Sequence, residues 1–247
     1  MNTTDALISR MEDIADKAVR SGWAASRFLT PSEAQTVAGR LQNKQVKFSF
    51  DGGFAGAERV RAVFVNPDWG EYQRADLLAA LEITYRPQDS LGHRDILGAI
   101  MALGIERDTI GDIVGGDHSA TLVCMPEMSG FISGSLTKSA RVGLSVSEIS
   151  LDQLPAKTEE MRIKSDTIAS LRLDAVLSAA FGLSRSKAAG IIEEGRVSLD
   201  YQLCQKPSKE LKEGALLSVR GVGRAKLLEI GGETRKGRIH ISIGVYV

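Results

Sequence analysis

The order of elements expected between residues 78 and 149 constrains the fold of this chain more than any other feature. Runs rich in apolar residues predict strands, and apolar residues at helical spacing predict helices. The strands fall at 78–85, 112–114, 120–124 and 142–149, and the helices at 91–103 and 126–137. This order, β-α-β-β-α-β, is typical of the split βαβ arrangement of ferredoxin-like folds, which many RNA-recognition domains share.

The predicted strand region at residues 117–123 lacks the side chains that such RNA-recognition domains use. Those domains stack bases on aromatic residues of a basic strand motif. Residues 117–123 contain no phenylalanine, tyrosine or tryptophan. The topology therefore permits RNA binding by this region without supporting it.

The residues on either side of this region predict two further parts. Apolar residues at helical spacing predict a helix over 7–19, and Thr30-Pro31-Ser32-Glu33 has the residues of a capping box, which begins a helix that runs to about residue 43. Strands are expected at 46–50 and 60–65, and the polar, proline-containing stretch 154–160 predicts a linker. We therefore expect an α+β protein with an N-terminal helical segment at 1–44, an RRM-like middle domain at 45–153 and a C-terminal domain at 161–247.

The C-terminal domain is expected to begin with a short strand at 168–173. Asp174 is expected to cap a first helix, and Ser184 a second helix that ends at Gly195. Four further strands are predicted at 196–199, 216–220, 224–230 and 238–245.

The charge of the chain is distributed unevenly. Lys and Arg number 31, as do Asp and Glu, so the formal net charge is zero. From residue 160 to the C-terminus, however, there are 15 basic and 10 acidic residues, a net charge of +5, which leaves −5 for the preceding part. A polyanion is therefore expected to bind the last third of the chain.

A cluster of basic residues in this last third indicates a phosphate-binding surface. Arg185 and Lys187 fall in the first turn of a predicted helix, where the helix dipole disfavours cations and backbone N–H groups attract anions. The alternative is that the basic residues are solvated surface charges. The predicted RNA-binding residues are Arg172, Ser184, Arg185, Lys187, Arg196, Lys206, Arg220, Arg224 and Lys226.

The spacing of residues in this segment resembles that of the S-four RNA-binding domain over about 55 residues. The matching positions are Arg172-Leu173-Asp174, Ser184-Arg185-x-x-Ala188, Ile191-Ile192-x-x-Gly195-x-Val197, Lys206-Pro207-Ser208, and Gly214 followed by 216–220. The resemblance implies RNA contacts at Arg172, Ser184, Arg185, Lys187 and Arg196. One departure is Asp200-Tyr201, where the family often has Asn-Gly at a hairpin turn.

The rest of the chain resembles the bacterial YlmH family over about residues 28–247. The resemblance rests on Phe28-Leu29-Thr30-Pro31, on Gly52-Gly53-Phe54 with Ala57-Glu58-Arg59, and on His93 to Gly98 leading through Leu103 to Arg107 and Ile110 to Ile113. It implies a role in ribosome-associated quality control on large subunits blocked by peptidyl-tRNA, with ribosomal RNA and tRNA as partners. It also implies a link to cell division. We expect a non-enzymatic protein that is a monomer when free.

Two alternative functions remain open on the sequence. An RNA-modifying enzyme would need a pocket in the middle domain, and its candidate residues are Asp95, Asp112, Asp117 and His118. A protein-docking adaptor, linked to cell division, would need an exposed apolar patch on the acidic first two domains. His93-Arg94-Asp95 imitates a kinase catalytic loop, but Ile100 stands where that loop requires asparagine.

The sequence gives no indication of a metal, a cofactor or a membrane segment. The three histidines fall in separate predicted elements, and the two cysteines stand 80 positions apart, so no zinc site or disulfide is expected. No apolar run approaches the roughly 18 residues that cross a bilayer. Because the first residues are also too acidic for a targeting peptide, we expect a cytoplasmic, ribosome-associated protein.

Overall fold

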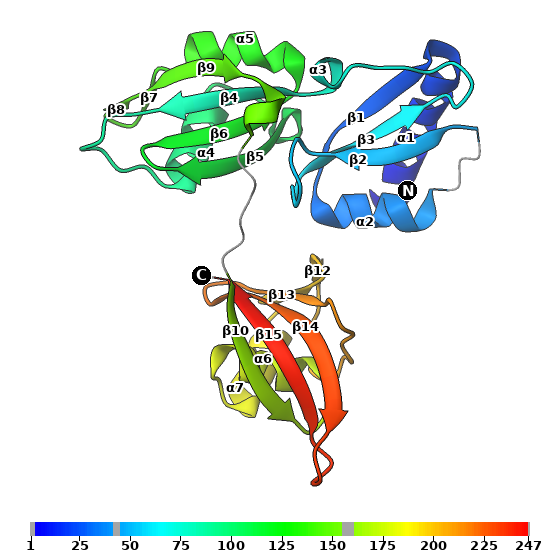
Figure 1. Ribbon diagram of the computed structural model, residues 1–247, viewed down its shortest axis with the longest axis vertical. Helices are drawn as coiled ribbons and strands as arrows, with labels where there is room; N and C mark the ends of the chain where they lie inside the picture. The colour runs from blue at the N-terminus through cyan, green and yellow to red at the C-terminus, as the bar shows by residue number, and fades with distance from the viewer. Residues whose placement is uncertain (1–2, 42–44, 155–160, 247) are drawn as a thin grey trace. The chain divides into compact units, whose positions relative to one another are not determined.

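The computed structural model describes residues 3–41, 45–154 and 161–246 and divides into two compact units (Figure 1). Unit 1 comprises residues 1–157 and unit 2 residues 158–247. The predicted linker at 154–160 lies outside the described residues except for Leu154. The division into domains at 1–44, 45–153 and 161–247 stays a prediction. Within the three described ranges, no helix is long and apolar enough to span a membrane.

Unit 1 begins with two helices packed on a three-stranded antiparallel sheet of order β1-β3-β2. Its elements are α1 (Thr3–Ser21), β1 (Trp23–Leu29), α2 (Pro31–Arg40), β2 (Lys47–Asp51) and β3 (Val60–Val65). The predicted capping box of α2 is present, because Thr30 Oγ1 accepts from the Glu33 N–H and the Glu33 carboxylate accepts from the Thr30 N–H. The predicted strand at 60–65 lies in the middle of this sheet, between the predicted strand at 46–50 and β1, a strand inside the segment that was expected to be helical.

The second part of unit 1 has the β-α-β-β-α-β order expected from the sequence. Its sheet is antiparallel, with the order β5-β6-β4-β9. The elements are α3 (Arg74–Leu77), β4 (Ala79–Thr84), α4 (His93–Met101), a 3-10 turn (Arg107–Thr109), β5 (Ile110–Gly116), β6 (Ser119–Cys124), α5 (Pro126–Ser135), β7 (Lys138–Ser139), β8 (Val142–Gly143), β9 (Ser145–Ile149) and a 3-10 turn (Leu151–Gln153). The strand predicted at 142–149 is divided into β8, which pairs with β7, and β9, which joins the larger sheet.

Both long helices of this part cover the same face of its sheet. Ile96 and Ile100 of α4 and Ile132 of α5 are buried in one cluster with Leu81 of β4 and Leu122 of β6. Side chains that alternate with these point to the opposite face, which the helices leave uncovered.

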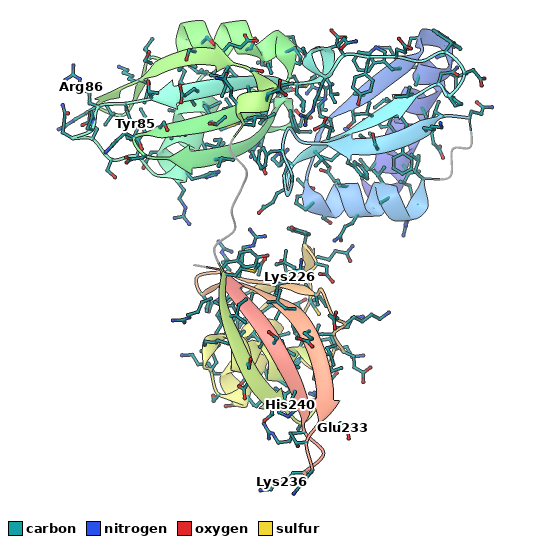
Figure 2. The ribbon with its side chains drawn as sticks, viewed as in Figure 1. Tyr85, Arg86, Lys226, Glu233, Lys236 and His240 are labelled. Atoms are coloured by element: carbon teal, nitrogen blue, oxygen red, sulfur yellow. The ribbon has the colours of Figure 1, made fainter. Side chains whose placement is uncertain are left out.

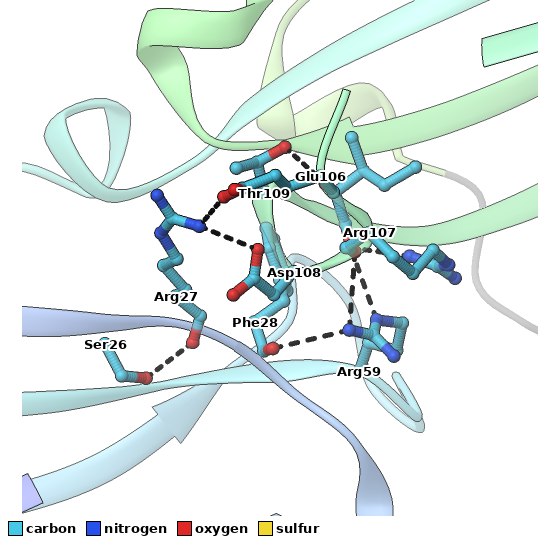
Figure 3. Close-up of polar contacts among 9 residues, drawn as sticks. Ser26, Arg27, Phe28, Arg59, Glu106, Arg107, Asp108 and Thr109 are labelled. Carbon is cyan, nitrogen blue, oxygen red and sulfur yellow. Dashed lines mark hydrogen bonds and ion pairs between the residues drawn. The ribbon is translucent and has the colours of Figure 1, made fainter. Parts of the chain in front are cut away.

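Polar contacts hold the two sheets of unit 1 together (Figure 3). Arg27 of β1 forms ion pairs with Glu106 and with Asp108, the latter at 3.0 Å. Arg59 donates to the backbone carbonyls of Phe28, at 3.3 Å, and Arg107, at 3.4 Å. Burial lowers the pKa of the Arg59 guanidinium, and nearby carboxylates oppose this effect. These contacts fix the first sheet against the segment that leads into β5.

Asp112 and Gly111 complete this junction. The Asp112 carboxylate accepts from the backbone N–H groups of Glu58, at 2.7 Å, and Arg59, at 3.2 Å. A Cβ at Gly111 would lie 2.7 Å from the ring of Phe28, so only glycine allows this approach of the two sheets. The motif residues that resemble the YlmH family in this region thus stabilise the arrangement of unit 1.

Unit 2 consists of a six-stranded antiparallel sheet of order β10-β15-β14-β13-β11-β12 and two helices. Its elements are β10 (Met161–Ile168), α6 (Leu173–Phe181), α7 (Arg185–Glu193), β11 (Val197–Leu199), β12 (Gln202–Leu203), β13 (Leu216–Val219), β14 (Gly223–Glu233) and β15 (Ile239–Tyr246). Both helices lie on one face of the sheet, where Val176 and Ile192 share a core with Leu217, Leu227 and Ile243 (Figure 1).

Two predictions for unit 2 are wrong. The strand expected at 168–173 ends at Ile168 and extends in the other direction, as β10. Asp174 does not cap α6, because the cap position is Arg172 and Asp174 lies buried in the first turn.

The hairpin turn at Asp200-Tyr201 has positive φ at both residues, 47° and 64°, which a two-residue turn of the primed type requires. The departure from Asn-Gly thus leaves the turn geometry intact.

Candidate nucleic-acid interface

The turn between α6 and α7 positions the basic residues that the sequence analysis singled out. α6 ends at Gly182, whose φ of 64° is the left-handed conformation that favours glycine. Ser184 then caps α7 as predicted, and its Oγ accepts from the Lys187 N–H at 3.2 Å. Arg185 and Lys187 lie in the first turn of α7, and both residues are exposed to solvent.

Asp174 brings Arg172 and Arg185 together. Its buried carboxylate accepts from Arg172 Nε at 3.2 Å, Arg172 Nη2 at 3.0 Å and Arg185 Nη2 at 2.9 Å. The side chain of Asp174 is 7% exposed, whereas those of Arg172 and Arg185 are 42% and 48% exposed. One carboxylate thus fixes two guanidinium groups whose outer surfaces face solvent. We call Arg172, Asp174, Ser184, Arg185 and Lys187 the helix-turn cluster.

The cluster carries more positive than negative charge. Burial raises the pKa of Asp174, but the hydrogen bonds and the positive charges of Arg172 and Arg185 together outweigh it, and the pKa lies below the ordinary value. The hydrogen bond to Asp174 raises the pKa of Arg172. The helix-turn cluster therefore contains three basic side chains and one carboxylate, which leaves an excess of positive charge for an anion.

We predict that Asp174→Asn lowers the free energy of unfolding by about 1–3 kcal/mol near neutral pH, because the buried acceptor loses its charge. The folded pKa of Asp174 is depressed, so its stabilisation is present above the unfolded-state pKa of about 3.9 and is lost as the pH falls through the folded value. Urea unfolding of both proteins at several pH values measures this. The difference in stability should shrink below about pH 4, and a difference that stays constant with pH would contradict the assignment.

The loop at 206–209 forms hydrogen bonds with the start of α6, next to the helix-turn cluster. The N–H of Asp174 donates to the Pro207 carbonyl at 3.1 Å, and the N–H of Leu173 donates to the Lys209 carbonyl at 2.8 Å. The first N–H groups of α6, which have no partner within the helix, are thereby satisfied. The predicted site residue Lys206 lies exposed at the start of this loop.

A second basic group lies on the sheet of unit 2. Arg196 donates to the Arg220 carbonyl at 2.9 Å, and Arg224 lies over the ring of Tyr246 with its guanidinium carbon 4.9 Å from the ring centroid. Arg196, Arg220 and Arg224 line one surface hollow together with Ser198 and Ser218. We call these three arginines the strand cluster.

Seven of the nine predicted site residues belong to the two clusters, and Lys206 and Lys226 lie outside them. Arg172, Ser184, Arg185 and Lys187 belong to the helix-turn cluster, and the strand cluster accounts for Arg196, Arg220 and Arg224. Lys226, which Figure 2 labels, lies two positions after Arg224 on β14, and residues two apart on a strand point to the same face of the sheet. Sequence reasoning missed the role of Asp174, although Arg172-Leu173-Asp174 was part of the quoted motif.

The four candidates for an RNA-modifying site have separate partners in the structure. Asp95 accepts from the Gly92 N–H at the start of α4, and Asp112 belongs to the junction of the two sheets. Asp117 and His118 form a solvent-exposed pair at the β5–β6 turn, 3.3 Å apart. Among the described residues, no group of three or more His, Cys, Asp or Glu side chains could hold a metal ion.

The helix-free face of the β5-β6-β4-β9 sheet contains a hollow that none of these four residues lines. Its lining includes Glu82, Thr121, Ile149 and Gln153. These side chains offer neither an aromatic platform for bases nor a positive charge for phosphates.

Comparison with known proteins identifies two segments of the chain. Residues 73–153 match the family model described as the putative RNA-binding domain in YlmH, and residues 171–217 match the S4 domain. The Ribosome-associated protein quality control protein P2 of Bacillus subtilis (strain 168) is 31% identical over an alignment of 220 residues, and the match covers 87% of this chain and 84% of that protein.

A solved structure shares part of the fold. The cell division protein YlmH from Streptococcus pneumoniae matches with a TM-score of 0.51 and 23% identity, over 63% of this chain and 97% of that one. With the identity and coverage of the Bacillus protein, and with a YlmH RNA-binding domain followed by an S4 domain, this chain belongs to the YlmH family.

Proposed function

We propose that this protein binds ribosomal RNA and tRNA on the large ribosomal subunit and acts in the quality control of subunits obstructed by peptidyl-tRNA. The observation that carries the RNA contact is the pair of arginines held on the buried Asp174 carboxylate beside the first turn of α7. Guanidinium groups in a fixed orientation suit phosphate oxygens, which they bind by two parallel hydrogen bonds. The quality-control role is supported by the name of the Bacillus relative.

Phosphate contacts and RNA shape select the binding site in this proposal. The helix-turn cluster and the strand cluster present arginines and serines, which contact the backbone of structured RNA without reading bases. The middle part of unit 1, which we propose to be RRM-like, contributes no aromatic stacking from its helix-free face. In this proposal the protein is cytoplasmic and ribosome-associated, is a monomer when free, needs no cofactor and catalyses no reaction.

The adaptor alternative finds no specific support in unit 1. It requires a contiguous exposed apolar patch. The large apolar side chains that are exposed in the described part of unit 1 are Trp69 and Phe131, and they belong to different elements.

Sedimentation through a sucrose gradient tests the proposal. Tagged protein in a bacterial lysate is expected to travel with large subunits, and enrichment of peptidyl-tRNA in the subunits that copurify is expected to accompany it. RNase treatment of the lysate should return the protein to the top of the gradient. If the protein stays at the top without RNase, or copurifies with empty subunits alone, the proposal is wrong.

A further inference from the structure

The β14–β15 hairpin extends beyond the rest of the sheet in unit 2. β13 pairs with β14 only from Gly223 to Lys226, and β10 pairs with β15 as far as Ile239. The turn at residues 234–238 therefore has no neighbouring strand in the described part of the chain. Figures 1 and 2 show it as a projecting tip, with Lys236 at its end.

The turn is closed by its own hydrogen bonds. The Thr234 N–H donates to the Arg238 carbonyl at 2.7 Å, and the Gly237 N–H donates to the Thr234 carbonyl at 2.9 Å. Thr234 Oγ1 accepts from the Arg238 N–H at 3.0 Å, and Gly237 has a φ of 70°. The backbone of the tip is thus fixed before any partner arrives, which lowers the entropic cost of binding.

The tip concentrates positive charge. Arg235, Lys236 and Arg238 are three of the five residues from 234 to 238, which include no acid, and all three are exposed. Like charges so close together repel one another and add nothing to the core. The arrangement instead offers three cations to one anionic surface.

A hollow connects the tip to the helix-turn cluster. The Arg238 guanidinium turns back from the tip, and its Nε donates to Thr167 Oγ1 at 3.1 Å. Arg238 and Arg185 line the same hollow between β10 and the α6–α7 turn, together with Asp166 and Gly182. Arg185 of the helix-turn cluster and Arg238 at the base of the tip are therefore the two basic residues of one hollow, which also contains the acidic Asp166.

We propose that the tip of the β14–β15 hairpin is a second RNA-backbone contact, in which Arg235 and Lys236 bind phosphates beyond those held by the helix-turn cluster. The inference rests on the proposed function. Anchors of protein interfaces are enriched in Trp, Tyr and Arg, and residues 234–238 contain no aromatic or large apolar residue. Their three cations favour a phosphate backbone, and a protein partner is an outcome of the test below. Arg238 orients the base of the tip through Thr167 and has the role of a positioning residue.

The test compares full-length R235A/K236A with wild type in binding to purified bacterial large ribosomal subunits at several salt concentrations. We expect the affinity to fall about 3- to 30-fold, because this is the contribution that two exposed charge contacts make to binding. The slope of log affinity against log salt should become shallower by about two. R235K/K236R should retain the wild-type slope. The matched control R162A/K212A removes the same charge from exposed positions elsewhere in unit 2 and should bind like wild type.

Each other outcome overturns a specific claim. If R235A/K236A matches wild type while R172A/R185A loses affinity, the hairpin contact is wrong and the proposed function stands. If both double variants match wild type, the proposed function fails as well. If R235A/K236A binds subunits weakly but binds deproteinised ribosomal RNA like wild type, the tip contacts a ribosomal protein and the RNA assignment is wrong.

Discussion

Replacing Arg172 and Arg185 together with alanine is expected to lower affinity for large ribosomal subunits by about 30- to 10⁴-fold, since a charge-assisted hydrogen bond contributes about 1–3 kcal/mol. Both guanidinium groups are held by the same carboxylate. Removing one should therefore alter the orientation of the other, and the two single substitutions should not be additive. Equilibrium binding of the two single variants and the double variant measures this coupling.

The lysine variant separates charge from geometry. R172K/R185K keeps both positive charges but loses the planar, two-pronged donor arrangement, so its affinity should fall between wild type and the alanine variant. In R172A/R185A the Asp174 carboxylate loses the hydrogen bonds from both arginines. Circular dichroism and thermal unfolding of this variant check that α6 is still folded. Wild-type affinity in a correctly folded R172A/R185A protein would refute the assignment of the helix-turn cluster.

Local patterns in the sequence were sufficient to predict much of the fold. The capping box at Thr30, the cap at Ser184 and the β-α-β-β-α-β order each depend on residues close together in the chain. Such signals act through short-range hydrogen bonds and the burial of one face, so they can be recognised without knowledge of the tertiary structure.

Features that depend on distant contacts could not be predicted in this way. The sequence of β1 does not end on an alternation of apolar and polar residues, because the neighbouring Phe28 and Leu29 are both buried. Leu29 belongs to the cluster with the helices, and Phe28 to the cluster with Val123 of the second sheet. Asp174 has a residue type favoured at helix caps, and its true role is visible only once Arg185 and the loop at 206–209 are placed around it.

The candidate site shows the same division. The S-four spacing identified Arg172 and Arg185 from residue types in order, but it gave no reason for both to contact one acid. The hairpin tip was absent from the predicted site because residues 234–238 lie after the part of the chain that carries the spacing. Its relation to Arg185 depends on the pairing of β14 with β15 and on the hollow that Arg238 shares with Arg185.

Binding is expected to weaken strongly with salt. If four or five cations of the predicted site contact phosphates, they should give a slope of log affinity against log salt of roughly −2 to −5, before any contribution from the hairpin tip, because each contact releases condensed counterions. A rise from 50 to 200 mM salt then reduces affinity by about 15- to 1000-fold. The predicted contacts are Arg172, Arg185, Lys187 and one or two of Arg196, Lys206 and Arg224.

Single substitutions distinguish this mechanism from docking through unit 1. Each arginine-to-alanine change in the contact set should make the slope shallower by about one and weaken binding to RNAs of different sequence nearly equally. Docking through the acidic N-terminal part would not release counterions from RNA, so it predicts a shallow slope that these arginines do not affect. Measuring affinity for large subunits at four salt concentrations, for wild type, R172A and R196A, separates the two mechanisms. A shallow slope shared by all three proteins would exclude phosphate contacts as the main source of affinity, even for a protein that binds the ribosome.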